Sequence, residues 1–241
     1  MANTKKSSFV IVYHRQPYDE VMEGGRVVYK ENKSPNGIVP ALKGFFSTAE
    51  DAVWVAWKQA PAAGKPMFER TVHIKDSYGE YDVVRLPLKA EQVKAFYHVT
   101  SKEALWPILH SFPDKFNYGP VDWENFREVN RLFAEAACEQ AKDDAFIWVH
   151  DYNLWLVPHY VRQIKPKARI AMFHHTPFPV DEFQFGEAQK VAGMIDTFCR
   201  ALFGNFVILT QESRQAQALQ MMGQQQLGRV GHDRPPDRSA M

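Results

Sequence analysis

Short apolar runs and segments with helical spacing alternate along residues 9–173 of this chain. Runs without internal polar positions predict strands covered on both faces of a sheet. We expect such strands at residues 9–13, 53–57, 145–149 and 168–173, and strands of alternating pattern at 68–74 and 81–86.

Helical spacing is clearest in residues 123–142, where Phe126, Val129 and Phe133 recur every three or four positions behind Asp122, a suitable N-cap. Gly24 and Gly25 between two apolar pairs predict a hairpin. Further helices are expected at 38–46, 90–97, 102–110 and 154–164. Strands joined by crossover helices predict an α/β fold, a doubly wound Rossmann-like domain at residues 9–179.

The two ends of the chain have a different character. Residues 1–8 are polar and are expected to be disordered. Residues 189–206 predict a helix followed by a short strand, but residues 211–226 are rich in glutamine and 228–241 in polar residues, proline and arginine. We therefore expect an atypical, partly disordered tail at 180–241.

Composition narrows the function classes. Hydrophobic residues make up 45% of the 241 residues and the net charge is +1, which favours a sizeable core and argues against general binding to nucleic acid or membranes. The two cysteines, the absence of a signal peptide and the lack of a long apolar span predict a soluble, cytoplasmic chain. Glycine-rich nucleotide motifs and metal-ligand spacings are missing, so no metal or cofactor is expected.

Polar groups follow three predicted strands directly, as His14-Arg15, as His150-Asp151 and as His174-His175. In an open α/β sheet, ligands bind beyond the carboxyl ends of the strands, so these groups are expected to meet at one edge. This convergence is a stronger indication of a site than any single residue.

Each candidate residue has two interpretations. Arg15 suits a phosphate or a carboxylate, but equally a loop salt bridge. Asp151 could accept a hydrogen bond from a sugar hydroxyl or cap the next helix, or do both. His175 could contact a sugar or be structural. Tyr97 and Trp106 could stack on a sugar, although nine residues apart they are more often core residues.

Several motifs resemble those of the trehalose-6-phosphate synthase family. They are Ile-Trp-Val-His-Asp-Tyr-Asn-Leu at 147–154, His-Thr-Pro-Phe-Pro at 175–179, Trp-Val-Ala-Trp at 54–57, Phe-Tyr at 96–97 and Leu-Trp-Pro-Ile-Leu-His at 105–110. Residues 14–20, 34–37 and 96–112 look closest to the branch that makes glucosylglycerol phosphate. The resemblance covers about residues 8–179 and implies the N-terminal half of a GT-B type glycosyltransferase, with its acceptor side in this domain.

The resemblance also implies site roles. Arg15, Tyr97 and Trp106 match positions around the acceptor's phosphate, Asp151 matches the contact to the acceptor hydroxyl, and His175 matches the histidine at the donor glucose. Gly37 matches a loop near the donor phosphates, with Asn36 where trehalose-6-phosphate synthases carry a second glycine. Asp151 and His175 would serve catalysis by position and electrostatics, without a side-chain nucleophile.

The implied reaction is retaining glucosyl transfer from ADP-glucose to glycerol 3-phosphate, a step toward an osmolyte used under salt stress. Two alternatives stay open: a trehalose-6-phosphate synthase that uses glucose 6-phosphate, and a non-catalytic module that binds a sugar phosphate. The family's later motifs and its donor domain have no counterpart after residue 179, so a frameshifted or truncated reading frame is expected there. The oligomeric state is not predicted.

Overall fold

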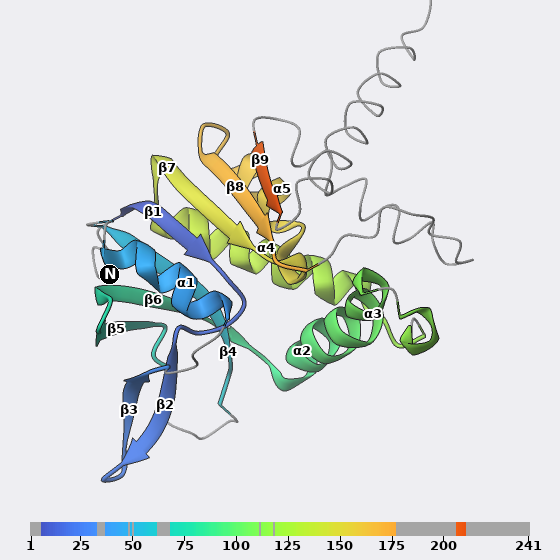
Figure 1. Ribbon diagram of the computed structural model, residues 1–241, viewed down its shortest axis with the longest axis horizontal. Helices are drawn as coiled ribbons and strands as arrows, with labels where there is room; N and C mark the ends of the chain where they lie inside the picture. Colours follow the sequence, from blue (N-terminus) through green and yellow to red (C-terminus); the bar gives the residue numbers. More distant parts are fainter. Residues whose placement is uncertain are drawn as a thin grey trace, which may run out of the picture.

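A seven-stranded sheet forms the centre of the molecule in this computed structural model (Figure 1). The structure describes residues 6–32, 37–47, 49, 51–61, 68–110, 112–117, 119–176 and the backbone of 206–210. The strands of this sheet are β1 (Ser7–Val12), β4 (Ala52–Gln59), β5 (Thr71–Asp76), β6 (Gly79–Leu88), β7 (Ala141–His150), β8 (Arg169–His174) and β9 (Phe206–Thr210).

The strand order is β5-β6-β4-β1-β7-β8-β9, and every neighbouring pair is parallel except β5 with β6. Without the antiparallel edge strand β5, this is the order of a doubly wound dinucleotide-binding sheet, which reverses direction on either side of β1. The expected α/β, Rossmann-like architecture is therefore confirmed. The switch point lies between β1 and β7.

Helices cover both faces of the sheet. They are α1 (Ile38–Lys43), α2 (Ala90–Val93), α3 (Trp106–Leu109), α4 (Trp123–Gln140) and α5 (Val157–Ile164), with a π-helix, η2 (Lys94–Leu105), and 3-10 turns η1 (Gly44–Ser47), η3 (Pro113–Lys115) and η4 (Tyr152–Leu154). In Figure 1, α1 lies on one face, whereas α4 and α5 lie on the other. None of the described helices is long and apolar enough to cross a lipid bilayer.

The central strands are apolar throughout because both faces are buried. In β1, Val10 and Val12 belong to the core under α4 and α5, whereas Ile11 and the following Tyr13 belong to the core under α1. This two-residue alternation between two cores explains why the sequence shows a continuous apolar run.

The predicted hairpin is present as β2 (Tyr18–Glu23) and β3 (Arg26–Glu31), an antiparallel pair. Its turn residues Gly24 and Gly25 have φ angles of 56° and 79°, which glycine adopts without a steric cost. In Figure 1 the hairpin projects away from the main sheet.

Several of the predicted helices differ from the structure in their bounds. The helix expected at 123–142 ends at Gln140, because Ala141 is already extended and begins β7. The helix expected at 154–164 begins only at Val157, with Pro158 in its first turn. The helices expected at 90–97 and 102–110 are joined into one helical segment by the π-helix.

Of the predicted tail at 180–241, the structure describes only residues 206–210. A short strand is expected at the end of residues 189–206, and the strand that the structure describes there, β9, begins only at Phe206 and pairs with β8. The disorder expected at 1–8 is wrong for Ser7 and Ser8, which form the start of β1 in the sheet. Residues 1–5, the helix expected within 189–206 and residues 211–241 lie outside the described residues.

Candidate functional site

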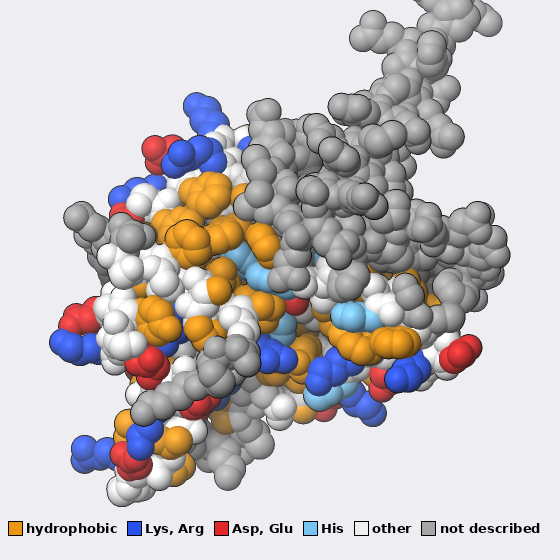
Figure 2. Space-filling model, viewed as in Figure 1, with side chains coloured by type: hydrophobic (Ala, Val, Ile, Leu, Met, Phe, Trp, Pro, Cys, Tyr) orange, Lys and Arg blue, Asp and Glu red, His pale blue; other side chains and the backbone are white. Residues whose placement is uncertain are grey.

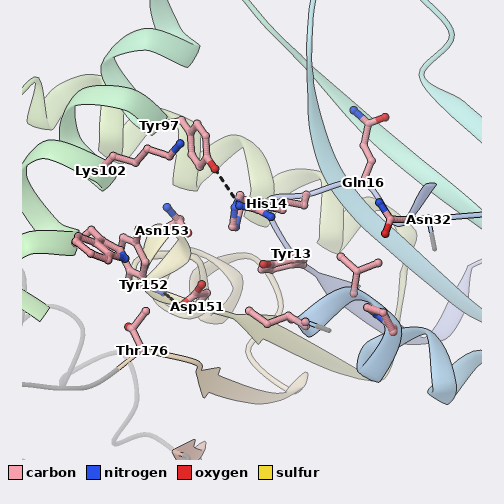
Figure 3. A pocket seen from close by; sticks show the side chains of 16 residues that line it. Tyr13, His14, Gln16, Asn32, Tyr97, Lys102, Asp151, Tyr152, Asn153 and Thr176 are labelled. Carbon is pink, nitrogen blue, oxygen red and sulfur yellow. Dashed lines mark hydrogen bonds between the residues drawn. The ribbon is translucent and has the colours of Figure 1, made fainter. Parts of the chain in front are cut away.

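A cavity of about 640 Å³ opens where β1, β7 and β8 end, beside the switch point of the sheet. Its wall combines the loop after β1, the start of α1, the π-helix and the segment after β7 (Figure 3). It is lined by Tyr13, His14, Arg15, Gln16, Asn32, Gly37, Ile38, Val39, Pro40, Tyr97, Lys102, Trp106, Asp151, Tyr152, Asn153 and Thr176. On the same face, Figure 2 shows histidine side chains in the middle of the surface.

Arg15 is positioned by the neighbouring strand. The indole Nε1 of Trp54 donates to the carbonyl oxygen of Arg15 at 2.9 Å, and Nη2 of Arg15 donates to the hydroxyl of Tyr97 at 3.4 Å. No carboxylate of the described residues forms an ion pair with Arg15, so the loop salt bridge considered for it is not found there. Arg15 also lines the cavity.

The π-helix explains why Tyr97 and Trp106 line one cavity although they are nine residues apart. In an α-helix of 3.6 residues per turn, about nine residues make two and a half turns and place the side chains on opposite faces. With hydrogen bonds five residues apart, roughly nine residues make two turns and place them on the same face. Lys102 lies between them, with its ammonium 4.6 Å from the ring centre of Tyr97.

Asp151 combines burial with an unusual backbone. Its φ of 73° and ψ of 162° fall in a region that only glycine adopts readily. The carboxylate accepts a hydrogen bond from the Tyr152 amide at 3.0 Å and another from the His175 amide. Burial nevertheless raises the pKa of Asp151 to about 6, although these amides and Arg15 oppose the shift. Asp151 is thus both the N-cap of η4 and a carboxyl group in the cavity wall.

The histidines at the strand ends lie behind the cavity wall. His150 is fully buried, and its Nδ1 lies 3.2 Å from Nε2 of His175. His174 is also fully buried and stacks on Trp155. Its Nδ1–H donates to the carbonyl oxygen of Thr176 at 2.7 Å. Burial lowers the pKa of each of these histidines, so they are neutral near pH 7.

Gly37 begins α1 and lines the cavity. Its φ of 134° and ψ of 179° again belong to the region open to glycine alone, so a side chain here would strain the turn. The glycine therefore brings the backbone of the first turn of α1 to the cavity edge.

The structure brings five of the six predicted site residues to one cavity: Arg15, Gly37, Tyr97, Trp106 and Asp151. His175 is not part of the lining of that cavity, but its amide donates to Asp151 and its ring centre lies 6.4 Å from that of the lining residue Tyr13. The roles assigned to these residues stay predictions.

The strand-end pattern included His14, which was given no role of its own, and Gln16, Asn32, Lys102 and Asn153 were not selected; all five line the cavity. Gln16 and Asn153 lie close behind selected strand-end residues, so the same pattern could have included them. Lys102 could be found only by knowing that the helix is a π-helix.

The order of the strands and the cavity at the switch point define a Rossmann-like domain. Its similarity to solved trehalose-6-phosphate synthases assigns the domain to the GT-B class of folds. The chain belongs to glycosyltransferase family 20, whose profile matches residues 7–185.

Individual relatives agree with this assignment. The chain is 62% identical to a glucosylglycerol-phosphate synthase of Synechocystis sp. over 73% of its length and 36% of the relative's. It is 36% identical to a trehalose-6-phosphate synthase of Mycolicibacterium gilvum over 72% of its length and 34% of that relative's. In fold it is similar to an α,α-trehalose 6-phosphate synthase of Burkholderia multivorans, with a TM-score of 0.65, 23% identity and coverage of 92% of this chain and 43% of that one. The chain thus spans about a third of the length of the curated relatives it matches.

Proposed function

We propose that this chain carries the acceptor side of a retaining glucosyltransferase that moves glucose from ADP-glucose to glycerol 3-phosphate in the cytoplasm. The product, glucosylglycerol phosphate, would be a precursor of an osmolyte made under salt stress. One observation supports this most directly. In the described part of the chain, two cations without an ion-pair partner, Arg15 and Lys102, line the same cavity as the carboxyl group of Asp151.

This arrangement suits an acceptor with a phosphate at one end and a hydroxyl at the other. Arg15, supported by Tyr97, would hold the phosphate, with Trp106 closing the cavity rim. Asp151 would accept the hydrogen bond of the attacking hydroxyl and orient it. Because its pKa is about 6, the carboxyl is mostly ionised at pH 7 and able to accept.

The donor is proposed to lie across from the acceptor. Gly37 would allow its phosphates to approach the backbone of α1, and His175 would contact the glucose. Residues 9–179 would thus contribute the acceptor site and one side of the donor site.

Glycerol 3-phosphate is preferred over glucose 6-phosphate because the chain is 62% identical to the named glucosylglycerol-phosphate synthase but 36% identical to the named trehalose-6-phosphate synthase. The phosphate contacts would be shared, so the two acceptors would compete for the same cavity.

The test measures binding and transfer together. Calorimetry should show that the chain binds glycerol 3-phosphate, and mass spectrometry should show glucosylglycerol phosphate when ADP-glucose is added. Arg15→Met should weaken acceptor binding roughly tenfold or more, because a charge-assisted hydrogen bond is lost. The control Arg26→Met, in the exposed turn end of the hairpin, should bind as the unaltered chain does.

The other outcomes separate the alternatives. Transfer to glucose 6-phosphate alone would support a trehalose-6-phosphate synthase. Binding of glycerol 3-phosphate without transfer would support a sugar-phosphate-binding module. Failure to bind either phosphate would contradict the proposal.

A further inference from the structure

His14 is buried in the cavity wall without a hydrogen-bond partner. His14 is 4% exposed, and neither Nδ1 nor Nε2 of its ring has a hydrogen-bond partner among the described residues. A buried polar group that makes no hydrogen bond destabilises the fold, so such groups in native proteins call for an explanation.

The described residues around the His14 ring pack against it but form no hydrogen bond with it. Aromatic rings pack on it, with ring centres 4.5 Å away at Tyr13 and 5.5 Å away at Tyr97. The same side chain also lines an adjoining cavity of about 430 Å³, so it stands between two open spaces. In Figure 3, His14 lies in the middle of the cavity-lining side chains, near Tyr97 and Asn153.

Positive charge surrounds this imidazole. Burial lowers the pKa of His14 to about 3, and the charges of Arg15 and Lys102 add to the shift. The ring is therefore neutral at pH 7 and carries one N–H donor and one acceptor nitrogen. Lys102 points over the ring of Tyr97 and has no ion pair with any described carboxylate.

We propose that His14 and Lys102 complete, with Arg15, a site for a phosphate monoester. His14 donates its N–H to one phosphate oxygen, while Lys102 and Arg15 supply two positive charges to the others. The inference deepens the proposed function, on which it rests, by naming two specificity-determining residues for the acceptor. It accounts for the unpartnered histidine, because the ligand provides the missing hydrogen bond.

Binding of three probes to the full chain tests this assignment. Calorimetry with glycerol 3-phosphate, inorganic phosphate and glycerol compares His14→Phe, which keeps an aromatic ring, and Lys102→Met with the unaltered chain. Both variants should bind glycerol 3-phosphate and inorganic phosphate roughly tenfold or more weakly, as expected for the loss of a hydrogen bond or a charge at an ionised ligand. Glycerol should bind weakly to all of them.

Matched controls come from the same helical segment. His98→Phe and Lys94→Met replace exposed residues that do not line the cavity and should bind phosphate as the unaltered chain does. A second readout needs no variant. The imidazole ¹⁵N signals of His14 should shift when inorganic phosphate is added and should not move with glycerol.

The outcomes separate the two proposals. If the unaltered chain binds glycerol 3-phosphate and both variants bind it within twofold, the roles of His14 and Lys102 are overturned while the proposed function stands. Unchanged His14 ring signals at saturating phosphate would overturn the role of His14 in the same way. If the unaltered chain binds no phosphate ester, the proposed function itself fails, and the inference fails with it.

Discussion

Asp151 combines a strained backbone with a buried carboxyl group. Its backbone occupies a conformation that side-chain-bearing residues rarely adopt, a strain of order 1–3 kcal/mol. Its carboxyl is buried, yet two backbone amides hold it in place. Both features are expected where a side chain must face a ligand rather than stabilise the fold.

We predict that Asp151→Asn removes a pH-dependent loss of stability. The pKa of Asp151 is about 6 in the folded chain against an ordinary value of 3.8. Its contribution to the free energy of unfolding is therefore fully present below pH 3.8 and is lost as the pH rises through 6. The loss amounts to about 3 kcal/mol by pH 7. Urea unfolding should show the variant gaining up to that amount over the unaltered chain between pH 4 and pH 7. A difference that stays constant with pH would contradict the raised pKa.

Individual residues were predictable to different degrees. Arg15 and Asp151 follow directly after buried strands, so the rule that ligands bind at the carboxyl ends of strands was enough to select them. His175 also follows a strand, but its side chain contacts His150 and is not part of the cavity lining. Strand position predicts the edge, whereas the direction of a side chain depends on one residue of register.

At the scale of elements, the π-helix is the feature that places the cavity wall. The hydroxyl of Ser101 donates to the carbonyl of Phe96, five residues earlier, at 2.8 Å in a buried position. The backbone of Trp106 makes the same five-residue bond to Ser101 at the end of the π-helix. The sequence predicted two separate helices here because helical periodicity at 3.6 residues does not fit a wider helix.

We predict that Ser101→Ala lowers the free energy of unfolding by about 1 kcal/mol, the contribution of a typical buried hydrogen bond. Urea unfolding followed by tryptophan fluorescence measures the change. Ser47→Ala is the matched control, since its hydroxyl also donates to a backbone carbonyl, that of Gly44, but is exposed. A larger effect at Ser47 than at Ser101 would refute this account.

Helix α1, which carries Gly37 to the cavity, is fixed to the sheet by a buried ion pair. Nζ of Lys43 lies 2.6 Å from Oδ2 of Asp76 at the end of β5, and the two side chains are 1% and 2% exposed. Asp76 also accepts from the hydroxyl of Tyr81 and the amide of Tyr78. Neither spacing nor composition predicted this pair, because its partners lie far apart in the sequence.

We predict that Lys43→Met lowers the free energy of unfolding by about 3–5 kcal/mol, because it leaves the charge of Asp76 buried and unpaired. Chemical denaturation measures the loss, and adding Asp76→Asn should recover part of it. Lys75→Met, which breaks the exposed pair with Glu80, should lower the free energy of unfolding far less than Lys43→Met does. Equal losses for the buried and the exposed pair would contradict the argument.

At the scale of the whole molecule, four histidines whose pKa burial lowers gather at the carboxyl edge of the sheet. His14, His150, His174 and His175 follow or end three different strands there, and the pKa of each is lowered chiefly by burial. The strand order thus concentrates both the candidate site and the chain's sensitivity to acid in one region.

We therefore predict that the chain loses stability steeply below pH 6.5. Above the ordinary histidine pKa of 6.5 both states are neutral, but below it the unfolded chain takes up protons that His14, with a folded pKa of about 3, and His174, with about 4, do not. Each should lower the free energy of unfolding by about 2 kcal/mol at pH 5. Urea unfolding at pH 7 and pH 5 measures the change. Between these pH values the free energy of unfolding of His14→Phe should fall by about 2 kcal/mol less than that of the unaltered chain. The control His98→Phe, at an exposed position, should lose as much as the unaltered chain. Equal losses in all three proteins would show that His14 is protonated as easily in the folded chain as in the unfolded one.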